Sequence, residues 1–293
     1  MASSALTKTY AKMGFVDFVE ARQGVLLKRR EGLPREQWTH DPILSSAKFC
    51  NIDRRDDAVT AEFLDAIRSH AHSWGLAEKI LLALALRFSG SRRGEASHLA
   101  NLIDSGLEIK DHKKTTPLRA AFEADEVRCG TGTYQLSLNR RQVATVIEKT
   151  AAAVVSRVQA DGPFTDVLEA SDFVAEAMTV GKRPQFSANE TAKDFAYVDG
   201  LMQPASHHRC KLGPGAKKGL SLVRATEGEA LAIAGSTEEE SVEALRAALR
   251  LIPSLAFVET IDVEQALCEY SKYEAYCTGG ISVGKRFEPR AEP

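Results

Sequence analysis

Cysteine is scarce in this chain, and the few cysteines show no paired spacing. Five occur among 293 residues: Cys50, Cys129, Cys210, Cys268 and Cys277. An odd number of widely separated cysteines does not resemble a disulfide framework. We therefore expect a protein that works in a reducing compartment.

The chain also has no long hydrophobic run. The longest, Ile80–Leu86, is much shorter than the roughly 20 apolar residues that a membrane-spanning helix needs. The first residues do not form a signal peptide, because Lys8, Lys12 and Asp17 interrupt any apolar stretch. These absences predict a soluble, intracellular protein with no membrane partner.

A strong excess of one charge is absent as well. The formal net charge is −2, with 27% charged and 44% hydrophobic residues, which is an ordinary globular composition that can bury a large core. This balance excludes a protein that is basic all over, but a local basic patch can still bind nucleic acid. Residues 200–226 form such a patch, since they contain no acid and five cations: Arg209, Lys211, Lys217, Lys218 and Arg224.

Strand patterns, internal repeats, heptads and low-complexity linkers are missing too. The helical spacing of apolar residues predicts helices over most of the chain, with a buried central helix at 76–88 and a polar loop at 181–190. The predicted helices are 5–31, 56–72, 76–88, 94–104, 139–159, 165–179, 191–201, 216–223, 238–251 and a last one, capped by Asp262 with Gln265, that ends near Tyr276. The pattern predicts an all-α fold.

Residues 236–239 (Ser-Thr-Glu-Glu) fit a capping box before the predicted helix 238–251.

The helical pattern extends over the chain, and we expect one helical catalytic domain over 1–293, divisible into two lobes of about 1–135 and 136–280. The Gly-, Pro- and charge-rich end of the chain predicts a flexible C-terminal tail.

Two common functional motifs are incomplete. Residues 279–286 fit G-x-x-x-x-G-K, but Arg286 stands where a P-loop has the Ser or Thr that reaches magnesium, and no helix follows. His207, His208 and Cys210 lie close together without a fourth ligand at a zinc-binding spacing. We therefore predict neither a nucleotide-binding P-loop nor a zinc site, and no certain cofactor, although a divalent metal such as Mg²⁺ stays open.

A glycine-rich turn is the first motif that carries chemistry. Gly213-Pro214-Gly215 precedes Lys217 and Lys218 at the start of a predicted helix. Backbone N–H groups exposed at such a turn can hold an anion, and the two lysines add charge. Phosphate binding of the helix-hairpin-helix type is one interpretation. A plain turn with solvated lysines is the other.

Polar residues gather in a second stretch, at Asn51, Arg54, Asp56 and Asp57. Arg54 could clamp a phosphate with two hydrogen bonds, and Asn51 could contact the edge of a base. A carboxylate beside cations can take the proton of an amine. The alternative is a surface charge cluster in which both acids favour the start of a helix.

A third stretch lies near the end of the chain. Glu269 and Lys272 are three apart on one helical face, which is typical of a surface pair but also suits a site. Tyr270 and Tyr273 beside them belong either to the core or to a stacking platform. We predict that the stretches 38–60 and 267–274 meet in one site, with the glycine-rich basic hairpin between them.

Four motifs in a fixed order carry a resemblance to a known family. They are Trp38-Thr39-x-Asp41-Pro42-Ile43-Leu44, Phe49-Cys50-Asn51-x-x-Arg54-x-Asp56-Asp57-x-Val59-Thr60, Gly213-Pro214-Gly215 with Gly219-Leu220, and Leu267-Cys268-Glu269-Tyr270-x-Lys272-Tyr273. The chain resembles the α-glutamyl/putrescinyl thymine pyrophosphorylases and the related helical domain of 5-hydroxymethyluracil DNA kinases. The resemblance spans roughly residues 15–290. It implies a helical fold derived from helix-hairpin-helix DNA glycosylases.

The resemblance implies an enzyme of thymine hypermodification in bacteriophage DNA, acting in the cytoplasm of the host cell. Because the chain lacks a credible P-loop, it looks like the transferase rather than the kinase. Its partners would be double-stranded DNA that carries pyrophosphorylated 5-hydroxymethyluracil and an amino acid or polyamine that replaces the pyrophosphate. The candidate catalytic residues are Asn51, Arg54, Asp57, Glu269 and Lys272, and the candidate substrate- or DNA-binding residues are Trp38, Lys48, Asp56, Arg209, Gly213, Gly215, Lys217, Lys218 and Tyr273.

Two other functions compete with this interpretation. A DNA glycosylase of this ancestry would need an aspartate close behind the hairpin, whereas Asp262 lies 47 residues after Gly215. A non-catalytic DNA-binding module that recruits a kinase is the second alternative, and a structural protein ranks below both.

Overall fold

A computed structural model describes residues 12–89, 95–105, 116–124, 126–127, 140–178, 185–204 and 209–279. Every regular element within these residues is a helix, and an isolated bridge joins Phe164 and Met202. The predicted all-α fold is therefore confirmed. None of the described helices is both long and apolar enough to cross a membrane.

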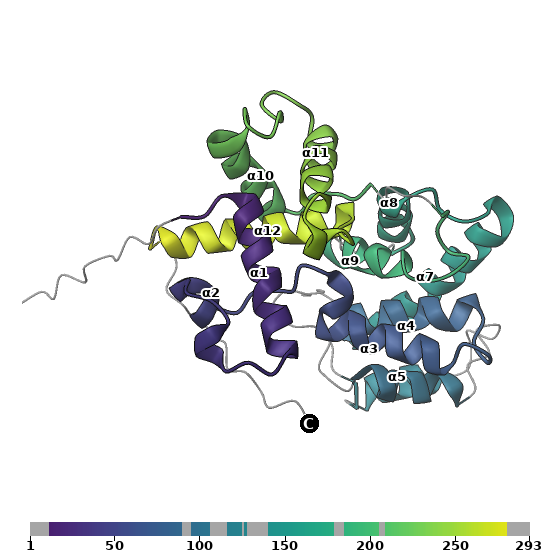
Figure 1. Ribbon diagram of the computed structural model, residues 1–293. Helices are drawn as coiled ribbons and strands as arrows, with labels where there is room; N and C mark the ends of the chain where they lie inside the picture. Colours follow the sequence, from purple (N-terminus) through teal and green to yellow (C-terminus); the bar gives the residue numbers. More distant parts are fainter. Residues whose placement is uncertain are drawn as a thin grey trace, which may run out of the picture. The chain divides into compact units, whose positions relative to one another are not determined.

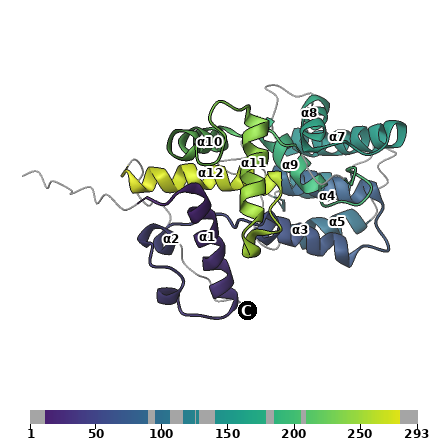
Figure 2. The same cartoon turned by 45° about the horizontal axis from the view of Figure 1, so that its top comes forward.

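The described residues divide into two compact units (Figures 1 and 2). Unit 1 combines residues 1–54 with 212–293, and unit 2 is the continuous stretch 55–211. The units are thus nested along the chain, in contrast to the consecutive lobes that we expected. Two segments far apart in the sequence complete unit 1 together.

The described residues of unit 1 form five α-helices and short 3-10 helices. They are α1 (Phe15–Arg30), η1 (Arg35–Gln37), α2 (Pro42–Ser46), α10 (Pro214–Glu227), α11 (Glu238–Arg250), η3 (Pro253–Leu255) and α12 (Thr260–Cys277). Helix α12 packs against each of the other four α-helices. In Figure 1, it is the long yellow helix of this unit.

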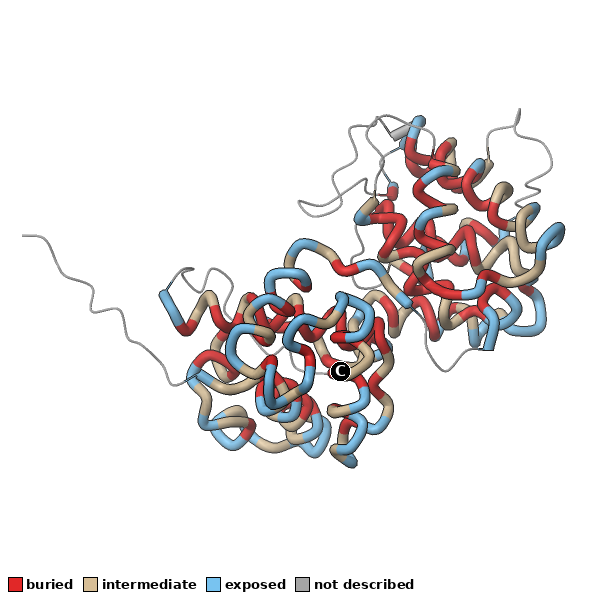
Figure 3. Tube along the Cα trace, turned by 90° about the horizontal axis from the view of Figure 1, so that it is seen from above, coloured by how far each residue is buried: buried red, intermediate tan, exposed pale blue. Residues whose placement is uncertain are grey.

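Unit 2 contains the remaining helices. They are α3 (Ala58–Ser69), α4 (Leu76–Ser89), α5 (Glu95–Asp104), α6 (Pro117–Glu123), α7 (Arg140–Asp161), α8 (Val167–Ala177) and α9 (Gln185–Phe195), with η2 (Arg54–Asp56) at the boundary between the units. Residues Ile80–Leu86 of α4 are at most 1% exposed. The predicted central buried helix is confirmed, and Figure 3 shows the buried residues on the inner sides of the helices in each unit.

Three predicted helix boundaries were wrong. Helix α9 begins at Gln185, inside the predicted polar loop, because its buried face consists mainly of small and polar residues such as Ala188 and Thr191. Helix α1 begins at Phe15 rather than residue 5, since Gly14 is its N-cap and the carboxylate of Glu227 accepts the Phe15 N–H at 2.7 Å.

The start of α12 is the third wrong boundary, and its capping box is shifted by one turn. Glu259 is the N-cap, and Asp262 at the third helical position accepts the Glu259 N–H at 2.9 Å. Asp262 is therefore not the cap that we predicted, and Gln265 bonds elsewhere. By contrast, the predicted capping box of α11 is confirmed, with Thr237 as N-cap and Glu240 as its partner.

Aromatic side chains hold α12 against α1. Phe15, Phe18 and Tyr273 are fully buried, and Tyr270 is 2% exposed. The Phe15 and Tyr270 rings meet edge-on at 5.5 Å, and the Phe18 and Tyr273 rings lie 5.0 Å apart. Burial of such rings contributes most of the packing energy of a small core, so the backbone of α12 is firmly placed.

Two glycines allow α10 to approach α12 closely. A Cβ atom added at Gly219 would lie well under 3.0 Å from the backbone carbonyl of Leu267, and one at Gly215 would meet the Cys268 sulfur at 2.5 Å. The glycines of the third motif are therefore packing residues in this structure. Their spacing of four places both on one face of α10.

We expect Gly219→Ala to lower the free energy of unfolding by about 1–3 kcal/mol, the usual cost of overpacking. Backbone atoms, unlike a flexible side chain, cannot turn away from the added methyl group. Urea unfolding measures the effect. Gly24→Ala is the matched control, because its Cβ would meet nothing within 4 Å in α1, so this variant should be unchanged or stabilised by up to about 1 kcal/mol. Equal effects of both substitutions would contradict the close contact.

Candidate active site

Residues 48–54, an irregular segment that ends at the first residue of η2, run antiparallel to α12 and are held by a row of polar side chains. The Arg54 N–H donates to Asp262 Oδ1 at 3.0 Å, and Gln265 Nε2 donates to the Asn51 carbonyl at 2.7 Å. The Cys50 N–H donates to Glu269 Oε2 at 3.1 Å, and Lys272 Nζ donates to the Lys48 carbonyl. We call this segment the site loop.

The spacing of these α12 residues explains the contact. Asp262, Gln265, Glu269 and Lys272 are separated by three, four and three residues, so they lie on one face of the helix. A segment outside helices and strands still needs partners for its buried N–H and carbonyl groups. Side chains of α12 supply them here, in the way that a neighbouring strand would.

Arg22 on α1 binds the same loop from a second helix. Its Nε donates to the Cys50 carbonyl at 3.1 Å, and its Nη2 donates to the Phe49 carbonyl at 3.2 Å and to Asn51 Oδ1 at 2.7 Å. The Arg22 residue is 5% exposed. Three consecutive residues of the site loop are thus fixed by one buried guanidinium.

Glu269 is the carboxylate at the centre of this arrangement. All of its hydrogen bonds within the described residues fall on Oε2, which accepts from the Cys50 N–H and lies 3.3 Å from Lys272 Nζ. Its side chain is 11% exposed, and that of Lys272 is 35% exposed. One oxygen is therefore held in place while Oε1 remains able to accept a proton, which is the arrangement that a general base requires.

Lys272 puts positive charge beside this carboxylate. Lys272 Nζ also lies 4.9 Å from the centre of the Phe49 ring, a favourable cation–π distance. Lys48 is exposed. The structure thus brings the two predicted stretches together through the contacts of Cys50 with Glu269 and of Lys48 with Lys272.

The residues of the first motif, Trp38 to Leu44, by contrast stabilise the fold around α2. Asp41 Oδ1 accepts the N–H groups of Ile43 and Leu44 at 2.8 and 2.7 Å, and its Oδ2 accepts the Tyr273 hydroxyl at 2.8 Å. Burial of the phenol raises the pKa of Tyr273, and the neighbouring Asp41 carboxylate raises it further. The phenol therefore stays protonated and donates. Tyr273 is fully buried, and a base could not stack on it here.

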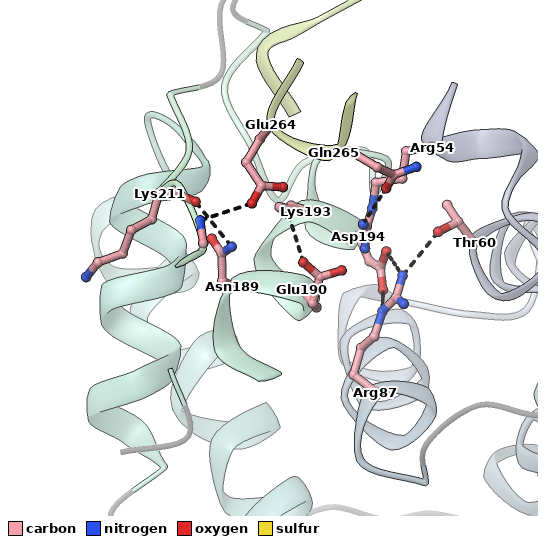
Figure 4. A network of polar contacts seen from close by, with 11 residues as sticks. Arg54, Thr60, Arg87, Asn189, Glu190, Lys193, Asp194, Lys211, Glu264 and Gln265 are labelled. Carbon is pink, nitrogen blue, oxygen red and sulfur yellow. Dashed lines mark hydrogen bonds and ion pairs between the residues drawn. The ribbon is translucent and has the colours of Figure 1, made fainter. Parts of the chain in front are cut away.

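Trp38 and Arg54, two other candidates, are also buried. The Trp38 indole N–H donates to the Leu33 carbonyl at 2.7 Å, and the residue is 8% exposed. Arg54 is 3% exposed, with Nη1 3.4 Å from Gln265 Oε1 (Figure 4). A phosphate could reach its guanidinium only if neighbouring groups moved, so the predicted phosphate clamp would require a rearrangement.

The acidic candidates Asp56 and Asp57 belong to unit 2. Asp56 ends η2, and Asp57 is the N-cap residue of α3 without a side-chain cap bond. Arg209, also in unit 2, is paired with Asp166, which accepts its Nε at 2.8 Å and caps α8. Roles of these three residues in catalysis or DNA binding stay predictions.

The glycine turn has an internal anion at its start. The Gly213 N–H donates to Glu264 Oε1 at 3.1 Å, so a carboxylate already faces the beginning of α10. Lys217 is paired with Glu238 at 3.0 Å, and Lys218 is exposed. Because residues 205–208 lie outside the described parts, the helix-hairpin-helix element and its phosphate contact stay predictions.

The described residues contain no group of three or more His, Cys, Asp or Glu side chains that could hold a metal. His207 and His208, which we did not expect to form a zinc site, and nearly all of the P-loop-like stretch 279–286 lie outside the described residues. Asp262, which lies too far behind the hairpin for the aspartate of a glycosylase, is 4% exposed and accepts the N–H groups of Arg54 and Glu259.

Sequence reasoning did not assign Arg22 or Gln265 to the site. Arg22 binds backbone carbonyls 27 and 28 positions away, and Gln265 binds one 214 positions away. The only role predicted for Gln265 was in a capping box with Asp262. The one available signal for Arg22 was a charged residue among the apolar positions of α1, where a buried cation needs partners.

Comparison with known proteins agrees with the motif order. A profile of the family described as "5-hmdU DNA kinase, helical domain" matches residues 9–85 and 119–282, more than half of the chain. The chain belongs to this family. The expected relation to the kinase helical domain is thereby confirmed, whereas membership of the pyrophosphorylase group stays a prediction.

One curated relative of this family member is the 5-hmdU DNA kinase of Bacillus phage SP10. The two are 26% identical over 233 residues, which cover 74% of this chain and 36% of the relative. The chain therefore spans far less than two thirds of that kinase. No solved structure matches the chain significantly.

Proposed function

We propose that this protein replaces the pyrophosphate of 5-pyrophosphorylmethyl-deoxyuridine in DNA with an amine or amino acid. The observation that carries the proposal is Glu269, whose Oε2 is held by the Cys50 N–H while Oε1 accepts nothing from the described residues. The family relation to a helical domain of 5-hmdU DNA kinases supports DNA carrying a modified uracil as the substrate. The protein would act in a bacterial host cell during phage growth.

The proposed reaction is a direct displacement at the methylene carbon on the pyrimidine ring. The lone pair of a neutral amine nitrogen forms the new C–N bond, and the C–O bond to pyrophosphate breaks with its electron pair leaving on oxygen. The nitrogen then carries an extra proton, which Glu269 Oε1 accepts. One pyrophosphate is released for each amine attached, so atoms and charge balance.

Charge near Glu269 supports departure of the pyrophosphate. Lys272 can receive negative charge that develops on the leaving oxygen. The target base would leave the DNA stack to reach these groups, as other base-modifying enzymes require.

A transfer assay tests the proposal. The protein is incubated with DNA containing 5-pyrophosphorylmethyl-deoxyuridine and a panel of amino acids and polyamines, and the digested nucleosides are identified by mass spectrometry. We expect a new amine-linked nucleoside, and none from control DNA with thymine. Release of a free base would instead support a glycosylase, and unchanged DNA with every amine would overturn the transferase proposal.

One observation favours a second candidate, a non-catalytic helical module that binds DNA for a kinase. The kinase relative is much longer than this chain, which corresponds to 36% of it. A module of this kind would bind DNA containing 5-hydroxymethyluracil without changing pyrophosphorylated DNA. Formation of the amine-linked nucleoside by the isolated protein would exclude it.

A further inference from the structure

Three tyrosines lie in the second half of α12, and their hydroxyl groups differ. The Tyr270 hydroxyl donates to the Met13 carbonyl at 3.2 Å, and the Tyr273 hydroxyl donates to Asp41. Tyr276 is partly exposed, and its hydroxyl forms no hydrogen bond with the residues that the structure describes. Because this oxygen is also not buried, the Tyr276 hydroxyl is the one of the three that lies open to a ligand.

Tyr276 extends the face of α12 that holds the site loop. Glu269, Lys272 and Tyr276 are separated by three and four residues, so they share one side of the helix. The Tyr276 ring meets the Phe49 ring edge-on at 6.1 Å, and Lys272 Nζ lies 4.9 Å from the centre of the same ring. One buried ring of the site loop thus contacts both side chains, which places them next to each other beside Glu269.

Lys272 has a hydrogen-bond donor to spare. Its ammonium group carries three N–H donors, whereas its acceptors within the described parts of the chain are the Lys48 carbonyl and Glu269 Oε2. The side chain is 35% exposed. Lys272 and Tyr276 therefore offer one donor each, together with a positive charge, from neighbouring positions whose Cβ atoms are about 5–6 Å apart on a helix.

We infer that Lys272 and Tyr276 form the subsite that binds the leaving pyrophosphate. This inference rests on the proposed function, in which Lys272 receives negative charge that develops on the leaving oxygen. The Tyr276 hydroxyl donates to another oxygen of the same group, which has oxygen atoms along its whole length for two adjacent donors. Lysine and tyrosine side chains also bind phosphates of the DNA backbone, so the test must separate these two sources of phosphate.

Isothermal titration calorimetry of the full chain with inorganic pyrophosphate, in the absence of DNA, measures the subsite directly. We expect the wild-type protein to bind pyrophosphate and Tyr276→Phe to bind it about tenfold more weakly, because one hydrogen bond to a charged group is lost. Phenylalanine keeps the ring that packs on Phe49, so the fold should be retained. No binding by the wild-type protein, or equal affinity in Tyr276→Phe, would overturn the inference.

Tyr270→Phe is the matched control. It removes a hydroxyl from the same helix, but one that bonds within the protein and belongs to a residue only 2% exposed. Its affinity for pyrophosphate should equal that of the wild-type protein. An equal loss of affinity in both variants would show that the effect of Tyr276→Phe is a general one, and would count against the subsite.

A second titration, with unmodified thymine-containing DNA, separates pyrophosphate from the DNA backbone. Tyr276→Phe should bind this DNA as tightly as the wild-type protein does, and a tenfold loss here would assign the hydroxyl to the backbone and overturn the inference. Pyrophosphate binding that depends on Tyr276, without any amine transfer, would contradict the proposed function and leave the subsite standing. Amine transfer with unchanged pyrophosphate affinity in Tyr276→Phe would do the reverse.

Discussion

Glu269→Gln should lower the rate of amine transfer by about 10²–10⁴-fold, the usual contribution of a general base. Glutamine keeps an oxygen that can accept the Cys50 N–H, so the site loop should remain attached to α12. It cannot accept the proton of the attacking amine. Single-turnover transfer at saturating amine measures the loss in the chemical step.

Glu20→Gln is the control for this substitution. Glu20 is an exposed residue of α1 in the same unit, so its variant should transfer at the wild-type rate. A thermal unfolding curve of Glu269→Gln close to that of the wild type would show that the fold is intact. Transfer by Glu269→Gln within threefold of the wild type would remove Glu269 from the role of base.

Asp194→Ala should lower the free energy of unfolding of unit 2 by about 3–5 kcal/mol, because it leaves a buried charge uncompensated. Asp194 is fully buried on α9 and accepts Arg87 Nε and Nη2 at 2.5 and 2.6 Å. Arg87 Nη2 also donates to Thr60 at 3.1 Å (Figure 4). The pair thereby joins α9, α4 and α3.

Two further variants check the cause of that loss. Asp65→Ala removes an acid from an exposed pair with Arg68, whose side chains are 73% and 69% exposed, and should change stability by no more than about 0.5 kcal/mol. Replacing both Arg87 and Asp194 with Met and Leu should recover part of the loss, since no charge remains buried. If Asp194→Ala alone lowered the free energy of unfolding by less than about 1 kcal/mol in urea, the buried charge of Arg87 would not be the cause that we give.

Much of the fold was predictable because most helices bury an apolar stripe. Residues Ile80–Leu86 are apolar nearly all round, and they form the buried part of α4. The start of α1 was not predictable, because the Phe15 N–H at its first turn donates to Glu227, 212 positions away. Helix α9 was placed too late because its first part buries polar side chains, among them Ser187 and Asn189, that a hydrophobic pattern counts as surface.

The candidate site was predictable only in part, for a related reason. Asn51 and Glu269 stood in motifs, and the structure brings their segments together through the Cys50 N–H. Tyr273 stands in the same motif as Glu269, but it is fully buried and donates to Asp41. Its role is therefore to stabilise the fold. The role of Arg22 could not be predicted from a motif, because its partners include backbone carbonyl groups, which every residue possesses.

The nested arrangement of unit 1 follows from the same long-range contacts. Several backbone N–H and carbonyl groups of residues 48–54 form hydrogen bonds with side chains that lie more than 200 positions later in the sequence. A pattern read along neighbouring residues cannot contain that information. The consecutive lobes expected from the sequence reflected this limit.

The most direct test of the proposed displacement is the stoichiometry of its products. In one reaction with pyrophosphorylated DNA and an accepted amine, the pyrophosphate released and the amine-linked nucleoside formed are both quantified. The displacement predicts one pyrophosphate for each amine-linked nucleoside, with both lost together in Glu269→Gln. Release of pyrophosphate with formation of 5-hydroxymethyl-deoxyuridine alone would contradict it, because water rather than the amine would then have attacked.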